Sequence, residues 1–273
     1  MKKTTNLLPA GVTKYFVLLL LTCFAFVGCS SNDDTTLQDD DNGGIIDTDP
    51  DTDPEPSQEM FYRIIRVENY EGSTSDENPT APSATLYYSL ESNEPMDSSY
   101  ARTRKWDLAF GGLYASFLSG NNGTNNHNNG YQAGGVGGIT IVEQPFDQVT
   151  DIPADSEFKT GVDLIGTDDA GAFGSGTGWY LYDFDGTIVG DSSEEKAHVA
   201  YALGEPLALA NGTVLPARTL IVKTANGNYA KIKMISVYKD VFTPEEWFKD
   251  TPHMYYTFEY VLVPAGSTQF EIH

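Results

Sequence analysis

Cysteine is almost absent from this chain of 273 residues: only Cys23 and Cys29 occur, and neither lies beyond position 29. The rest of the chain has no thiol with which to form a disulfide or bind a metal ion. A folded domain there must be stabilised by apolar burial and by backbone hydrogen bonds. The length is sufficient for one β domain with a hydrophobic core.

Basic residues are also scarce, with 16 Lys and Arg against 39 Asp and Glu and a formal net charge of −23. Binding to nucleic acid requires Lys and Arg to neutralise phosphates, so this charge argues against a nucleic-acid partner. Hydrolase and nucleotide-binding motifs are missing as well. The glycine-rich stretch Gly174–Gly178 (GSGTG) lacks both the lysine of a phosphate loop and the third glycine of a dinucleotide loop. These absences predict a protein that is not an enzyme.

The four histidines show no metal-binding pattern. They are His127, His198, His253 and His273, and no two of them have the spacing of metal ligands. The acidic residues fall largely in segments that are predicted to be loops or linkers. We therefore predict no metal site.

One long apolar run is present, Tyr15–Gly28 (YFVLLLLTCFAFVG), and three lysines precede it. It is short for a membrane-spanning helix, and the pattern is typical of a signal peptide. Because the run ends in a glycine just before Cys29, residues 1–28 resemble a bacterial lipoprotein signal, with lipidation of Cys29. An ordinary signal peptide with a chance cysteine is the alternative. Asp33 and Asp34 resemble the acidic surface-export signal of Bacteroidetes lipoproteins, which implies an outer-membrane, surface-exposed location.

Residues 29–59 are rich in Asp, Thr and Pro and poor in apolar residues. Such a segment cannot bury enough surface to offset its chain entropy, so it is predicted to be a disordered acidic tether. Its repeated Asp-Thr-Asp-Pro does not fit a calcium loop, because the loop glycine is missing and prolines interrupt it. The folded domain is predicted to span residues 60–273.

The central feature of that domain is a predicted hairpin, residues 219–238 (TLIVKTANGNYAKIKMISVY). Asn226-Gly227 is typical of a type I′ turn between paired strands. In the second strand, apolar residues alternate with Lys231 and Lys233, which predicts one buried and one solvated face. Residues 255–263 are expected to add to this hairpin as an antiparallel third strand.

Further predicted strands also indicate a mainly β, antiparallel fold. They are expected at residues 61–67, 84–90, 106–110, 138–143 and 179–182, with residues 113–118 continuing or pairing with the strand at 106–110. One or two short helices are expected, at residues 194–202 and at residues 243–249, where Thr243 is an N-cap and Pro244 takes the first helical position. Gly120–Gly138, rich in Gly and Asn, is predicted to be a long mobile loop that leaves His127 in solvent.

Four stretches together resemble the HmuY-like haemophore family of Bacteroidetes. They are Lys105–Phe110 (KWDLAF), Trp179–Tyr182 after its glycines, the hairpin at residues 219–233, and Tyr256–Phe270. The resemblance implies a nearly all-β fold on a lipid-anchored surface protein. It also implies non-catalytic capture of haem, free or from a haemoprotein, for delivery to an outer-membrane transporter.

The sequence departs from that family at the iron ligands. The resemblance implies one histidine before the Gly-Trp strand and one just after it. Here residues 158–178 contain no His, Met, Cys or Tyr, and Phe184 occupies the later position. Haem iron requires such a donor, so neither position provides one.

Other family members use methionine, so Met254 and Met96, both near loop edges, are candidate ligands together with His253. The other methionines have plainer interpretations, since Met234 fits a core position and Met60 begins the domain. Tyr180 and Tyr182 could ligate iron, although strand tyrosines usually pack.

Arg102, Arg104 and Lys105 form the densest basic group and are candidates for the haem propionates, or else a solvated turn. The missing ligands leave a second hypothesis open. In that hypothesis the chain is an accessory lipoprotein, structural or glycan-contacting, that kept the fold and lost the haem site.

Overall fold

Thirteen strands and five 3-10 helices of three residues each make up the described part of the chain. The computed structural model describes residues 56–273 except 74, 75, 77 and 79, and the described residues belong to one unit, Asp49–His273. Cys29, the predicted signal peptide and the tether up to residue 55 lie outside the described residues. Among the described residues, no helix is long and apolar enough to cross a membrane.

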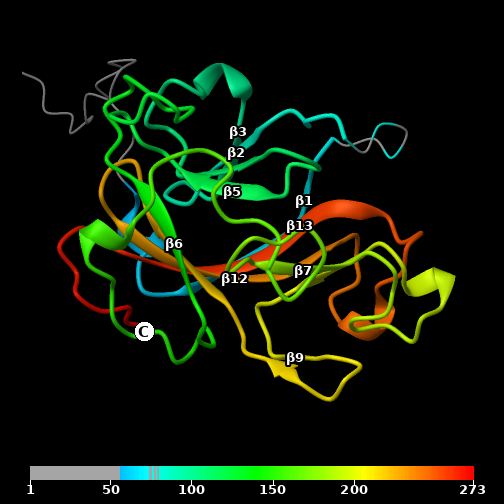
Figure 1. Ribbon diagram of the computed structural model, residues 1–273. Coiled ribbons are helices and arrows are strands. Elements are labelled where there is room, and N and C mark those ends of the chain that lie inside the picture. The colour runs from blue at the N-terminus through cyan, green and yellow to red at the C-terminus, as the bar shows by residue number, and fades with distance from the viewer. Residues whose placement is uncertain (1–55, 74–75, 77, 79) are drawn as a thin grey trace, which may run out of the picture. The chain divides into compact units, whose positions relative to one another are not determined.

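The larger sheet has five antiparallel strands in the order β1-β13-β12-β11-β6 (Figure 1). Its centre is the predicted hairpin, in which Leu220 pairs with Ile232, and the predicted third strand, in which Phe258 pairs with Met234. The antiparallel three-stranded arrangement is therefore confirmed. The strands are β1 (Ile64–Glu71), β6 (Gly138–Val142), β11 (Thr219–Lys223), β12 (Tyr229–Tyr238) and β13 (His253–Val263).

A second antiparallel sheet has the order β3-β2-β4-β5 and packs against the larger one. Tyr88 and Phe110 from this sheet contact Phe258 and Tyr256 of β13, with ring centroids 5.5 Å and 4.5 Å apart. The main core therefore lies between the two sheets, and the mainly β fold class is confirmed. The strands are β2 (Leu86–Ser89), β3 (Glu94–Met96), β4 (Leu108–Gly111) and β5 (Phe117–Gly120); two pairs, β7 (Tyr180–Asp183) with β8 (Val199–Ala202) and β9 (Leu207–Ala208) with β10 (Val214–Leu215), complete the sheets.

The prediction that the lysine face of the hairpin is solvated is wrong for Lys231, which is 2% exposed. Its ammonium group donates hydrogen bonds to the carbonyl oxygens of Phe146 and Val149, at 2.8 and 2.9 Å, and lies over the Phe146 ring. The segment after β6 and Phe270 near the C-terminus cover this face with a second apolar cluster. Because paired carbonyls and an aromatic ring replace water, the lysine can be buried.

The predicted type I′ turn is also wrong. That turn requires a positive φ at both central residues, but Gly227 has a φ of 92° and Asn226 is not among the residues with positive φ. The amide of Gly227 donates to the carbonyl of Thr224 at 3.1 Å, and Thr224 pairs with Asn228. The hairpin thus closes with a three-residue loop whose last residue is a left-handed glycine, a common alternative to the two-residue turn.

Both helix predictions are wrong in extent. Residues 194–202 form the 3-10 helix Glu194–Lys196 followed by strand β8, because Val199, Tyr201 and Ala202 are buried against the core. The segment that begins at Thr243 forms only the 3-10 helix Pro244–Glu246. The remaining 3-10 helices are Gln58–Met60, Ser98–Tyr100 and Asp155–Glu157.

The Gly- and Asn-rich segment, residues 120–138, is held by buried asparagines rather than being a free loop as predicted. Asn121 donates to the carbonyls of Thr103 and Trp106, and Asn122 donates to the carbonyl of Gly137. Asn128 donates to three further carbonyls. These amides replace the ladder hydrogen bonds that an irregular segment lacks, while His127 is exposed as predicted.

Two of the stretches that carry the family resemblance meet at a buried carboxyl group, that of Asp107. It accepts hydrogen bonds from the backbone amides of Leu90 and of Ala225, at 2.8 and 3.0 Å. The neighbouring carboxylate of Glu91 accepts hydrogen bonds from the side-chain amides of Asn226 and Asn228. The Trp-Asp strand therefore anchors the tip of the hairpin, which is a structural role.

This cluster predicts a pH-dependent stability. Burial and the adjacent Glu91 carboxylate raise the pKa of Asp107 to about 8, from roughly 3.9 in an unfolded chain. Its contribution to stability is therefore complete below about pH 4 and is lost progressively as the pH rises from there to about 8. Asp107→Asn removes a hydrogen-bond acceptor and is expected to be less stable than the wild type at about pH 5, with the gap narrowing toward about pH 9. Melting temperatures across that range test this, and a constant gap would contradict it.

Candidate functional site

Met254, a predicted iron ligand, lies in the main core and is 6% exposed. Its carbonyl accepts a hydrogen bond from Gly72 at 2.7 Å. The side chain of the adjacent His253 is partly exposed, with Nδ1 3.2 Å from the carbonyl oxygen of Thr251 and Nε2 3.2 Å from a carboxylate oxygen of Asp76. The sulfur of Met254 is therefore buried, and both imidazole nitrogens of His253 already have polar neighbours.

Met96 lies far from that pair, on the outer face of the four-stranded sheet. It pairs with Tyr87 and packs against the cluster of Tyr87 and Trp106. Successive strand residues point to opposite faces, and the neighbour Tyr88 faces the main core with Met254. The structure therefore does not bring Met96 and Met254 together.

The predicted propionate residues lie just before β4, where Arg102 is exposed and Lys105 is half-buried. Arg102 donates to the carbonyl oxygen of Tyr131 at 3.1 Å, and the ammonium group of Lys105 lies over the Tyr100 ring. Arg104 is exposed beside them. This segment adjoins residues 120–138, which begin at the last residue of β5.

A group of exposed aromatic side chains lies at the other end of β4 and β5, where β7 and β8 meet the connection between those strands. Tyr180 of β7 is hydrogen-bonded to Ser116 in that connection, with the oxygens 2.9 Å apart. Beyond Tyr180, the rings of Phe173, Tyr182, Phe184 and His198 lie together; we call these four residues the aromatic patch. Phe173 is 77% exposed and Phe184 is 41% exposed.

The rings of the aromatic patch contact one another closely. The centroids of Phe173 and Phe184 are 5.5 Å apart in an edge-to-face arrangement, and those of Phe184 and His198 are 4.7 Å apart. Phe173 and His198 have φ angles of 62° and 60°, in the left-handed region that bulky side chains rarely adopt. Exposed aromatic rings on such backbone are a reason to look for a ligand there.

Buried carboxylates hold both segments that carry the phenylalanines. Asp168, before Phe173, accepts hydrogen bonds from the amides of Ala170 and Gly178 and from the guanidinium group of Arg218. Asp183, before Phe184, accepts hydrogen bonds from the amides of four residues that follow it, Thr187, Ile188, Val189 and Gly190. The patch is thus positioned by buried polar groups beneath it.

His198 is the exposed donor of the patch. Its Nδ1 lies 2.9 Å from the hydroxyl oxygen of Tyr182, and no hydrogen bond to its Nε2 occurs among the described residues. Burial raises the pKa of the Tyr182 hydroxyl to about 12, so this group is a neutral phenol under ordinary conditions. Imidazole nitrogen is one of the donors that bind haem iron, so the patch fits a haem in its donor chemistry.

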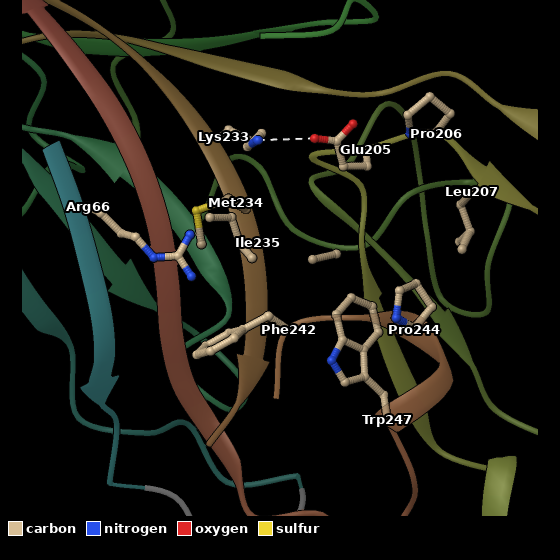
Figure 2. A pocket seen from close by; sticks show the side chains of 11 residues that line it. Arg66, Glu205, Pro206, Leu207, Lys233, Met234, Ile235, Phe242, Pro244 and Trp247 are labelled. Carbon is tan, nitrogen blue, oxygen red and sulfur yellow. Dashed lines mark hydrogen bonds and ion pairs between the residues drawn. The ribbon is translucent and has the colours of Figure 1, made fainter. Parts of the chain in front are cut away.

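A separate groove of about 240 Å³ lies on the outer face of the larger sheet (Figure 2). Phe242, Pro244 and Trp247 form one wall, and Arg66 and Lys233 lie at its rim. Lys233 pairs with Glu205 at 3.0 Å, and both cations contact Glu259 in the strand between them. The charges are therefore mutually compensated. Met234 provides the sulfur atom of this groove and is 2% exposed, so the groove offers no accessible iron ligand.

Comparison with known proteins identifies the family. The family model described as HmuY protein matches residues 83–260, a range that holds β2 to β12 and the whole aromatic patch. The chain belongs to the HmuY family. No curated protein matches it.

Two solved structures are similar to this HmuY-family chain. The apo HmuY analog of Tannerella forsythia has 14% sequence identity and a TM-score of 0.31, with 73% of this chain and 97% of that chain covered. A candidate lipoprotein of Bacteroides fragilis has 14% identity and a TM-score of 0.26, with 75% and 91% covered.

The structure brings together the two segments for which the family resemblance implies histidine ligands. Phe173 belongs to the stretch before the Gly-Trp strand, and Phe184 occupies the position after it. Their ring contact within the aromatic patch shows that the two segments lie side by side. In this HmuY-family chain Phe184 fills the later position, the earlier stretch contains no histidine, and the histidine next to Phe184 is His198.

His198 is missing from the candidates drawn from the sequence because its segment is predicted to be helical there. In the structure β8 pairs with β7, so that the amide of His198 donates to the carbonyl of Phe184 at 3.2 Å. The signal that could have found it is Val199–Ala202, whose residues are all apolar and include β-branched and aromatic side chains typical of a strand. Among the described residues, no group of three or more His, Cys, Asp or Glu side chains could hold a metal ion.

Proposed function

We propose that this HmuY-family protein binds haem, or a related planar apolar ligand, on the aromatic patch. The observation that carries the proposal is an exposed histidine, His198, beside two exposed phenylalanines, Phe173 and Phe184. Phe173 and Phe184 would pack against the macrocycle, because planar apolar surfaces gain from leaving water and from contact with aromatic rings. His198 would supply the iron ligand from Nε2.

The proposed biological role is acquisition, without catalysis. Lipidation of Cys29 and the acidic tether of residues 29–59 would hold the domain at the surface of the outer membrane. Haem, free or from a haemoprotein, would be bound there and passed to an outer-membrane transporter. Partly exposed binding on a surface patch is consistent with such a transfer, since a partner can reach the ligand.

A haem titration followed by Soret absorbance tests this proposal. Wild type is expected to give a saturable Soret shift, and His198→Ala is expected to lose it or to bind at least about tenfold more weakly, as for other metal ligands and their supports. His127→Ala is the matched control, because that histidine is exposed on residues 120–138, away from the patch. It is expected to behave as wild type.

The same titration tests the ligand candidates that the sequence indicates. His253→Ala, Met254→Ala and Met96→Ala are each expected to keep the wild-type Soret position, because their donor atoms are bonded or covered. If one of these variants loses the shift and His198→Ala keeps it, the assignment to the aromatic patch is wrong. If wild type shows no shift, the accessory lipoprotein, structural or glycan-contacting, becomes the better hypothesis.

A further inference from the structure

The hydrogen bond between Tyr182 and His198 bears on which imidazole nitrogen can bind a metal. The hydroxyl oxygen of Tyr182 and Nδ1 of His198 are 2.9 Å apart, and this is the one hydrogen bond of that hydroxyl among the described residues. A neutral histidine has one nitrogen that donates and one that accepts. The tautomer is therefore set by the direction of this hydrogen bond.

The surroundings favour one direction. The Tyr182 ring lies against Phe173, Phe184 and the imidazole, and none of these rings except the imidazole offers an acceptor for the hydroxyl proton. If Nδ1 carried the hydrogen and donated to Tyr182, the hydroxyl proton would go to water, because no other group among the described residues accepts it. If Tyr182 donates to Nδ1, the hydroxyl proton is held within the pair and the exposed Nε2–H donates to water.

We propose that Tyr182 donates to Nδ1 and so holds neutral His198 in the tautomer with hydrogen on Nε2. The inference rests on the proposed function, because it concerns how readily His198 binds iron. Nε2 can bind iron only with its lone pair free. Ligation therefore requires one proton to leave Nε2 for solvent and one proton from solvent to reach Nδ1, while the Tyr182 hydroxyl turns to accept. Tyr182 is thus a positioning residue that weakens iron binding and favours release.

Nitrogen NMR of the haem-free protein tests the tautomer directly. The expected spectrum of His198 has the shift of a protonated Nε2 and of a hydrogen-bonded acceptor Nδ1. In Tyr182→Phe the Nδ1 signal is expected to lose the hydrogen-bond shift. Tyr255→Phe is the matched control, because its hydroxyl bonds Glu71 and not a histidine. Wild-type His198 with hydrogen on Nδ1 would overturn the inference.

Haem binding gives the second readout. Tyr182→Phe is expected to bind haem about two- to tenfold more tightly than wild type, the range given by one ordinary hydrogen bond. Affinity that is unchanged or weaker would overturn the positioning role. If wild type binds no haem, the proposed function fails, whereas the tautomer measurement on the haem-free protein still decides the inference.

Discussion

Arg218→Met is expected to destabilise the protein by about 3–5 kcal/mol, because it breaks a buried ion pair and leaves one partner charged. Arg218 is 6% exposed, and its Nε and Nη2 lie 3.3 and 3.1 Å from one carboxylate oxygen of Asp168. Asp168 is fully buried, so the carboxylate cannot regain the lost interaction from water. Urea denaturation monitored by tryptophan fluorescence measures the loss.

Lys223→Met is the matched control for that experiment. Its ammonium group pairs with Asp155 at 2.8 Å, but the Asp155 side chain is 67% exposed. An ion pair at the surface contributes at most about 1 kcal/mol, so this variant is expected to stay close to wild type. Similar losses in the two variants would show that Asp168 does not depend on Arg218. The Arg218 variant is also expected to weaken haem binding, because Asp168 orders the segment that carries Phe173.

Asp183→Ala is expected to cost about 3 kcal/mol or more, since four backbone amides lose a charged acceptor at once. The Asp183 side chain is fully buried, and its two oxygens lie 2.8–3.2 Å from the amide nitrogens of residues 187–190. Thermal unfolding measures the effect. Haem affinity is expected to fall with it, because the same residues fix the chain next to Phe184.

Asp185→Ala provides the comparison for Asp183→Ala. Asp185 lies two residues further along the chain and is exposed, so its removal is expected to change stability by less than about 0.5 kcal/mol. Asp183→Asn keeps one acceptor oxygen and is expected to fall between the two. Equal melting temperatures for the Asp183→Ala and Asp185→Ala proteins would contradict the claim that Asp183 stabilises residues 187–190.

The sequence was sufficient to predict most of the large sheet, since its strands follow the two-residue alternation of a half-buried β-strand. Lys231 shows the limit of that pattern. Its burial depends on Phe146, which lies 85 positions earlier in the chain, and local alternation contains no information on such a contact. The asparagines of residues 120–138 show the same limit, because composition predicts a free loop while their hydrogen bonds depend on tertiary placement.

The candidate site was harder to predict, for a related reason. The sequence places the later family ligand position at Phe184 and the earlier one within residues 158–178, but His198 joins these segments only through the pairing of β7 with β8. A helix at residues 194–202, as the sequence predicts, excludes the pairing of this segment with β7. Met254 failed as an accessible donor because its strand continues into the core, whereas its neighbours in sequence suggested a loop edge.

The most direct test of the central claim, ligand binding on the aromatic patch, is a backbone amide NMR titration with gallium protoporphyrin, a diamagnetic analogue of haem. The ring current of the porphyrin shifts nearby amides, so the affected residues mark the site. The account predicts the largest shifts at Phe173, at Phe184 and at His198, with residues 96–105 unchanged. The largest shifts around Met96 or at Arg102, Arg104 and Lys105, with none at His198, would contradict it.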